Sequence, residues 1–227
     1  MSAQGKIREH IKVAPTENLI IWMMYVAAIP IARIALSLKL SPNFLTTLSS
    51  GFAISSGMAL LVDGLRYAFI PLFISSILLD FADGLVARTS GTIGRTAFRY
   101  DHISDLFKVS FVVLCLAIFC NTTVVWMLGT GSLMLFLIST VLNHDLSFAL
   151  NNATQKSRQD SFQIRKPNNA IITNIFTIFF TYNSHTLLIY VFIATSPQFA
   201  APVFAYLLII SAYACVRYIN SLRKLEN

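Results

Sequence analysis

Apolar stretches long enough to cross a lipid bilayer recur along the whole chain, and this feature constrains the fold more than any other. A transmembrane helix needs roughly 20 consecutive, mostly apolar residues. Charged residues make up only 12% of the chain, about half of their share in a soluble domain. The apolar segments are 44–62, 67–87, 104–126, 130–150, 170–194 and 199–217. The sequence therefore predicts an all-α polytopic membrane protein with six transmembrane helices.

The positions of the basic residues indicate how these helices are oriented. The net charge is +7, but Lys and Arg flank the apolar segments, which favours membrane topology over nucleic-acid binding. The short connections 62–66, 129–131 and 196–202 hold one basic residue, Arg66. The other connections and both termini carry the basic clusters. Because positively charged loops remain cytoplasmic, we expect both termini and the 88–103 connection on the cytoplasmic side.

The N-terminal segment 18–38 is also apolar and allows two interpretations. Pro30 and Arg33 lie within it, and a seventh span would leave the basic N-terminus outside. We therefore expect an amphipathic helix in the cytoplasmic membrane interface, while a seventh span stays open. Residues 1–40 would then form the cytoplasmic N-terminus and interfacial helix, and 41–227 the six-span membrane domain. We expect no removable signal peptide, because the first residues are polar.

Four of the ten acidic residues lie within one short stretch at the ends of two apolar segments. Residues three or four positions apart share a face of a helix. Asp80 therefore pairs with Asp83, and Asp101 with Asp105. The sequence between them, RTSGTIGRT, contains two glycines and can reverse the chain. We expect two antiparallel helices whose carboxylate pairs face one another near the cytoplasmic boundary.

Such a carboxylate cluster favours a divalent-metal site. Ionisable groups within a span are costly, and divalent cations compensate clustered carboxylates. Carboxylate oxygens suit Mg²⁺, Mn²⁺ or Ca²⁺, and no Cys or His set suggests zinc. Two such metal ions stabilise both the attacking and the leaving oxygen in a displacement at phosphorus. Gly84, Ala87 and Ala97 leave space beside the acids, and Arg88 supplies a planar cation for phosphate. For each aspartate taken alone, the alternative that its side chain merely faces water or caps a helix stays open.

The spacing of these residues resembles the signature of the CDP-alcohol phosphotransferases, also called CDP-alcohol phosphatidyltransferases. The signature is D-x2-D-G-x2-A-R-x8-G-x3-D-x3-D, and the sequence matches it at every position but one. The departure is Ala97, where the family has its second glycine. This change adds one methyl group beside the expected nucleotide site. The segment SPNFLT at 41–46 and the six-span layout also resemble the family.

The resemblance implies a transferase in which a hydroxyl attacks the phosphorus of a CDP-alcohol and expels CMP. Two divalent cations, Mg²⁺ or Mn²⁺, would assist, and Ca²⁺ would be a non-productive or structural ion. Asp105 would be both a metal ligand and the general base. The implied metal ligands are Asp80, Asp83, Asp101 and Asp105, and the implied CDP-binding residues are Gly84, Ala87, Arg88 and Ala97. The resemblance also implies a homodimer.

The acceptor site is less well defined. His102 follows the third aspartate, as in the choline and ethanolamine phosphotransferase branch, but the Glu of that branch is Phe98 here. His102 is therefore a candidate auxiliary base or acceptor-site residue. Lys108, one turn beyond the last aspartate, and Asn183 and His185, in the fifth apolar segment, are further candidates for an acceptor pocket. For His102, the alternative of a helix-start histidine bonded to a carboxylate stays open. For Asn183 and His185, simple interhelical hydrogen bonding stays open.

Together these features predict an enzyme of phospholipid biosynthesis in the cell membrane, namely the inner membrane of a prokaryote. Its active site would face the cytoplasm. It would transfer a phosphatidyl group from CDP-diacylglycerol to an alcohol hydroxyl. One alternative is a choline- or ethanolamine-type enzyme that transfers a phospho-alcohol from a CDP-alcohol to diacylglycerol. Another is a non-catalytic cation-binding or transport protein. The acids gather at one boundary beside Arg88, which favours a phosphate ligand over an ion pathway.

Overall fold

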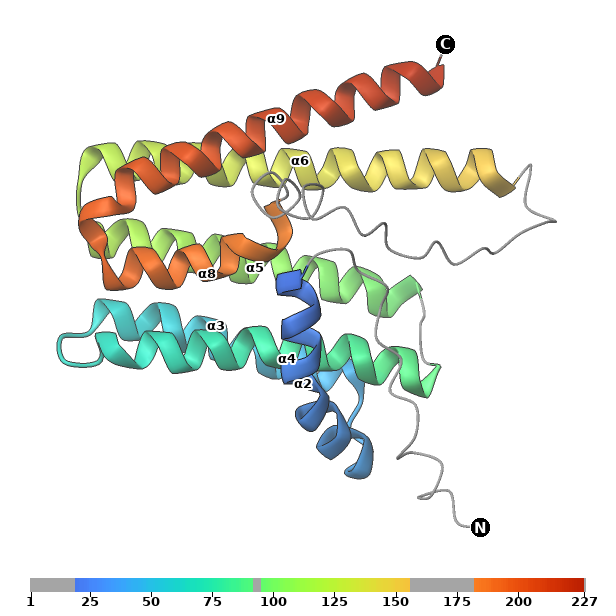
Figure 1. Cartoon of the computed structure of the whole chain (residues 1–227), viewed down its shortest axis with the longest axis horizontal. Coiled ribbons are helices and arrows are strands. Elements are labelled where there is room, and N and C mark those ends of the chain that lie inside the picture. Colours follow the sequence, from blue (N-terminus) through green and yellow to red (C-terminus); the bar gives the residue numbers. More distant parts are fainter. Residues whose placement is uncertain (1–18, 92–94, 156–181, 227) are drawn as a thin grey trace.

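The computed structural model describes residues 19–91, 95–155 and 182–226, and no strand occurs among them. Figure 1 shows that most of the helices run lengthwise beside one another, while α2 runs across them. The elements are α2 (Leu19–Ser37), α3 (Pro42–Leu61), η1 (Arg66–Ala68), α4 (Phe69–Ser90), α5 (Arg95–Cys120), α6 (Thr123–Gln155), α8 (Tyr182–Thr195), η2 (Pro197–Phe199) and α9 (Ala200–Glu226).

Within these ranges, five helical segments are long and apolar enough to cross a membrane. They are Pro42–Leu61, Arg66–Ser90, Tyr100–Cys120, Thr123–Asn143 and Pro197–Arg223. The prediction of an all-α, multi-pass membrane protein is therefore confirmed. The expected span 170–194 is described only from Tyr182 onward, as α8. The total of six spans stays a prediction for that reason, as does the division of the chain at residues 40 and 41.

The connection predicted at 129–131 is wrong, because both of its glycines lie inside α6. The chain turns earlier, at Asn121, which has a left-handed φ of 47°. The Thr122 hydroxyl then accepts a hydrogen bond from the Val125 N–H at 3.3 Å, as an N-cap does. The glycines serve helix packing instead. A Cβ on Gly131 would lie 2.9 Å from Leu208 Cδ1, so its absence lets α9 approach α6 closely.

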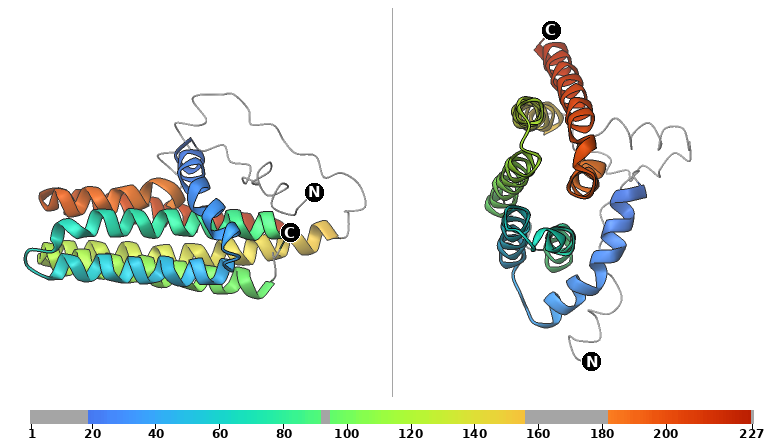
Figure 2. Two further views of the ribbon diagram at one scale, coloured as in Figure 1. Left: turned by 90° about the horizontal axis from the view of Figure 1, so that it is seen from below. Right: turned by 90° about the vertical axis from the view of Figure 1, so that its left-hand side faces the viewer.

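Helix α2 lies crosswise to the bundle. In the right-hand view of Figure 2, most of the bundle helices are seen nearly end-on or obliquely, whereas α2 is seen from the side. This orientation favours an interfacial helix over a seventh span, and the interfacial assignment stays a prediction. The helix continues through Pro30 without a break. The sequence predicted an amphipathic helix, but large apolar side chains also occupy the exposed face of α2. They are Trp22, Met23, Val26 and Ile34.

The inner face of α2 is built from small residues. Ala28 and Ala32 are fully buried, and Ala35 nearly so. They pack in one apolar cluster with Leu85 and Val86 of α4. Small side chains allow two helices to approach closely. Helix α2 is therefore fixed against the half of α4 that carries the acidic residues.

Helix α3 packs against both α4 and α5. A Cβ on Gly57 would lie 2.9 Å from Cys115 Sγ and 2.9 Å from Phe111 Cε1, both on α5. No larger residue fits there without a shift of these groups, so the glycine allows close contact between α3 and α5. Because α3 touches both aspartate-bearing helices, it sets the distance between them.

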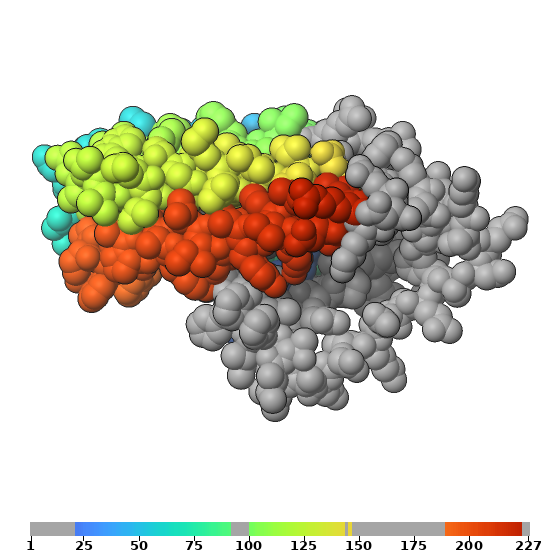
Figure 3. All heavy atoms as spheres, turned by 90° about the horizontal axis from the view of Figure 1, so that it is seen from above, coloured from blue at the N-terminus to red at the C-terminus, as the bar shows by residue number. Residues whose placement is uncertain are grey.

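The remaining helices α6 and α9 pack together and form one face of the molecule (Figure 3). Large apolar side chains are exposed on these helices, among them Met127, Met134, Ile209 and Val216. In a bilayer such residues contact lipid tails without loss of stability. The surface of these two helices therefore agrees with the membrane assignment.

Candidate active site

The acidic residues lie where α4 ends and α5 begins. Gly91 has a left-handed φ of 70°, and its N–H donates to the Ala87 carbonyl, which closes α4. Glycine adopts this conformation without steric strain. Helix α5 then begins at Arg95, beyond residues that the structure leaves undescribed. The chain thus reverses between the two aspartate pairs, as the glycines of this segment predicted.

Three carboxylates from the two helices converge. Asp80, Asp101 and Asp105 each place an oxygen within 4.8 Å of the oxygens of the other two. Divalent metals bind carboxylate oxygens at about 2.0–2.6 Å. One cation can therefore contact all three residues.

Asp83 lies beside this group and is held from a third helix. The hydroxyl of Thr46, on α3, donates to Asp83 Oδ2 at 2.5 Å. Both residues are buried, at 2% exposure for Thr46 and 5% for Asp83. A buried carboxylate needs such a hydrogen bond, because it has lost its contact with water. The hydroxyl of Thr46 thus fixes the orientation of the fourth aspartate.

A lysine completes the cluster. The Nζ atom of Lys108 forms ion pairs with Asp80 Oδ1 and, at 2.7 Å, with Asp105 Oδ1. It also donates to the hydroxyl of Ser49, at 3.2 Å. Lys108 is therefore directed into the carboxylates and joins α5 to α3 and α4.

The residues present fit a bound metal. Asp101 Oδ1 is buried and has no hydrogen-bond partner in the described part of the chain. A buried, unpaired carboxylate oxygen is costly, and a cation would satisfy it. The converging donors are all carboxylate oxygens, the ligand type that Mg²⁺ and Mn²⁺ prefer. The four aspartates could hold one or two such ions.

Arg88 occupies the space beside Gly84 that was predicted to receive a ligand. A Cβ on Gly84 would lie 3.2 Å from Nη1 and 3.3 Å from Nη2 of Arg88. The guanidinium also lies over the ring of Tyr25, with its central carbon 5.1 Å from the ring centroid. This cation–π contact brings α2 into contact with the site. The glycine thus makes room for the arginine of its own helix.

The structure describes the side chains of only some of the other predicted site residues. Ala87 and His102 are half-buried, on α4 and α5 respectively. Ala97 lies in the first turns of α5, and its side chain is outside the described set. Asn183 and His185 lie in α8, and their side chains are likewise outside it. The predicted acceptor pocket therefore stays a prediction.

Three hydroxyl residues of α3 contact the site but were not among the residues predicted from the sequence. Thr46, Ser49 and Ser50 are three and four residues apart and lie on one face of the helix. They donate to Asp83, accept from Lys108 and bond to Ser104 Oγ at 2.5 Å, respectively. Hydroxyl residues at helical spacing within an apolar span were the signal that could have revealed them.

Comparison with known proteins agrees with this geometry. Residues 39–215 match the sequence model of the CDP-alcohol phosphatidyltransferases. Comparisons with curated proteins and with solved structures found no match. The matched region runs from the residues before α3 into α9 and includes all four aspartates. Because the match covers most of the chain, this protein belongs to the CDP-alcohol phosphatidyltransferase family.

Proposed function

We propose that this protein transfers a phosphatidyl group from CDP-diacylglycerol to an alcohol hydroxyl and releases CMP. The family match supports a phosphotransferase activity in phospholipid synthesis, and the five apolar helices support a location in a membrane. The observation that carries the proposal is the convergence of Asp80, Asp101 and Asp105 within 4.8 Å. Asp83 lies on α4 with Asp80, and Arg88 follows on the same helix, one turn beyond Gly84.

The four aspartates would hold two divalent cations, Mg²⁺ or Mn²⁺. When bound, these ions would neutralise the phosphate oxygens of the donor and stabilise the leaving CMP oxygen. Asp80, Asp101 and Asp105 support this role because their carboxylate oxygens lie within 4.8 Å of one another. Asp83 supports it through the fixed orientation that Thr46 gives its carboxylate.

Arg88 would bind the diphosphate of the nucleotide. Its guanidinium carries a permanent charge and matches the geometry of phosphate oxygens. Arg88 lies one turn beyond Gly84 on α4, and its guanidinium lies over that glycine. The cation–π contact with Tyr25 limits its motion. The guanidinium is thus held beside Gly84, the residue that follows Asp83.

Asp105 would be the general base. Its side chain is 43% exposed, compared with 28% for Asp80. An acceptor hydroxyl can therefore reach Asp105 more readily. Asp105 would take the hydroxyl proton while the hydroxyl oxygen forms its bond to phosphorus. The bond between that phosphorus and the CMP oxygen would break, and CMP would leave with the bonding electrons.

We also propose that the site faces the cytoplasm and that the protein forms a homodimer. The turns between α3 and α4, α5 and α6, and α8 and α9 lie together at the opposite end of the bundle (Figure 1). These turns carry few basic residues, which supports the orientation. The homodimer rests on the family resemblance alone.

Mass spectrometry of reaction products tests the function. The purified protein would be incubated with Mg²⁺ or Mn²⁺, a panel of alcohols, and either CDP-diacylglycerol or CDP-choline with diacylglycerol. CMP and a new phospholipid formed from CDP-diacylglycerol would support the proposal. A product formed only from CDP-choline and diacylglycerol would move the enzyme to the choline-type branch. No CMP from either donor would favour a non-catalytic cation-binding protein.

A further inference from the structure

Lys108 lies at the centre of the aspartate cluster, and the proposed reaction gives it no role. The residue is 8% exposed. Its Nζ atom contacts three oxygens, which belong to Asp80, Asp105 and Ser49. A lysine ammonium has three N–H donors, so these contacts engage all of them. No donor remains for the phosphate of an acceptor, which argues against the acceptor-site role considered from the sequence.

The surroundings of Lys108 hold it in place. Ser49 is fully buried, and its hydroxyl donates to the Ser76 carbonyl of α4 at 2.9 Å. The lysine of α5 is thus connected to α3 through Ser49 and to α4 through Asp80. A buried charge is stable only where it is paired and hydrogen-bonded. The position of this ammonium group is therefore set by the residues around it.

The carboxylates need such a group when no metal is bound. Ionised oxygens that lie within 4.8 Å of one another in a partly buried site repel strongly. Lys108 offsets one of these charges and bridges the two helices from which the carboxylates come. A divalent cation bound at Asp80 and Asp105 would need the same carboxylates and would also be repelled by the ammonium.

We propose that Lys108 is a built-in counter-cation of the metal site. It holds Asp80 and Asp105 together in the metal-free protein and competes with the divalent cation for these two carboxylates. Lys108 is thus a positioning residue that stabilises the metal-free form and weakens metal binding. This inference rests on the proposed function, because it takes the cluster to bind a divalent cation.

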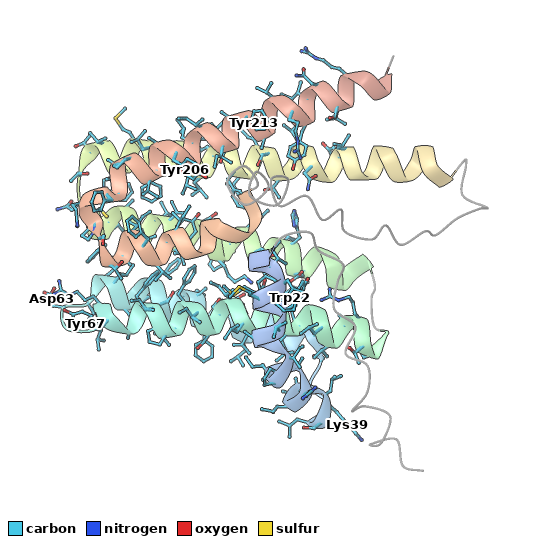
Figure 4. All side chains as sticks on the ribbon, viewed as in Figure 1. Trp22, Lys39, Asp63, Tyr67, Tyr206 and Tyr213 are labelled. Atoms are coloured by element: carbon cyan, nitrogen blue, oxygen red, sulfur yellow. The ribbon has the colours of Figure 1, made fainter. Side chains whose placement is uncertain are left out.

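The experiment compares full-length wild type with Lys108→Met, which keeps the side-chain length and removes the charge. Lys39→Met is the matched control, because Lys39 is exposed at the end of α2 (Figure 4). Thermal unfolding is measured in EDTA and in saturating Mn²⁺, and Mn²⁺ affinity by electron paramagnetic resonance of the free ion. Lys108→Met should unfold at a lower temperature in EDTA, and Mn²⁺ should reduce this difference. It should bind Mn²⁺ at least about tenfold more tightly, while Lys39→Met matches wild type.

Two results would overturn the inference: an equal loss of thermal stability in EDTA and in Mn²⁺, or unchanged or weaker Mn²⁺ binding. Either would show that Lys108 is only a structural residue, and the proposed function would stand. If wild type binds no Mn²⁺, the proposed function itself fails, and this inference with it.

If Lys108→Met can be purified only with metal, the double variant Asp80→Asn/Lys108→Met keeps the inference testable. This variant removes both charges of one ion pair, and an unpaired buried charge is the main source of instability after a single change. It should therefore be more stable in EDTA than the single variant. A double variant that is equally unstable or less stable would contradict the role of Lys108 as a counter-cation.

Discussion

Replacing Thr46 with valine tests whether α3 orients the fourth aspartate. Valine keeps the shape of threonine and removes the hydroxyl that donates to Asp83 Oδ2 at 2.5 Å. Thr46 and Asp83 are both buried, so water cannot replace the lost donor. A hydrogen bond to a charged group contributes about 1.5–3 kcal/mol. This range corresponds to roughly 10- to 150-fold in an equilibrium constant.

The loss should appear as a higher Mn²⁺ concentration for half-maximal CMP release, by at least about tenfold. Thr46→Ser keeps the hydroxyl and removes one methyl group, so its Mn²⁺ requirement should remain close to that of wild type. Thr140→Val is the matched control, because the Thr140 hydroxyl donates only within α6, to the Phe136 carbonyl at 2.8 Å. This control should leave the Mn²⁺ dependence unchanged.

Two outcomes would refute this reasoning. If Thr46→Val has the Mn²⁺ dependence of wild type, the hydrogen bond does not hold Asp83 in a geometry that the site needs. If Thr46→Ser is impaired as much as Thr46→Val, the loss comes from the packing of the methyl group and not from the hydroxyl.

Three further predictions concern the metal, the departure from the family signature and the orientation. EDTA should abolish CMP release, and added Mg²⁺ or Mn²⁺ should restore it; undiminished turnover after exhaustive chelation would contradict a metal site at the aspartates. Ala97→Gly restores the family residue and should remain active, at a cost of at most about 1 kcal/mol in helix stability; complete loss of CMP release would mean that α5 is not built as the signature implies. In a background without the native cysteines, a cysteine that replaces Ser90 should be labelled only from the cytoplasmic side. A cysteine that replaces Asp63, at the opposite end of the bundle (Figure 4), should be labelled only from outside. The reverse labelling pattern would contradict the proposed topology.

The sequence predicted the site better than it predicted the helix boundaries. The positions of Asp80, Asp101 and Asp105 follow from helical spacing and a glycine-containing reversal, and the structure brings these three residues together. The turn between α5 and α6 was misplaced at two glycines. Glycine has two uses, in turns and in close helix packing. Only the tertiary contact of Gly131 with Leu208 shows which use applies here.

The contacts that link the aspartates to other helices could not be predicted from the sequence for a related reason. Thr46 and Lys108 are 37 and 28 residues away from the carboxylates they bind, Asp83 and Asp80. Periodicity shows which residues share one helix face, but it does not show which faces meet across three helices. The contact of Arg88 with Tyr25 was missed for the same reason, because it depends on the crosswise position of α2.

The most direct test of the proposed function is CMP release from CDP-diacylglycerol by wild type and by Asp105→Asn. Donor binding in the presence of Mn²⁺ is measured in parallel, with Asp80→Asn as the comparison. Asparagine keeps the shape and one oxygen ligand but cannot accept a proton from the acceptor hydroxyl. Loss of a general base lowers the rate by about 10²–10⁴-fold. The proposal predicts near-normal donor binding with this loss of turnover for Asp105→Asn, and weakened donor binding for Asp80→Asn. Normal turnover by Asp105→Asn would contradict it.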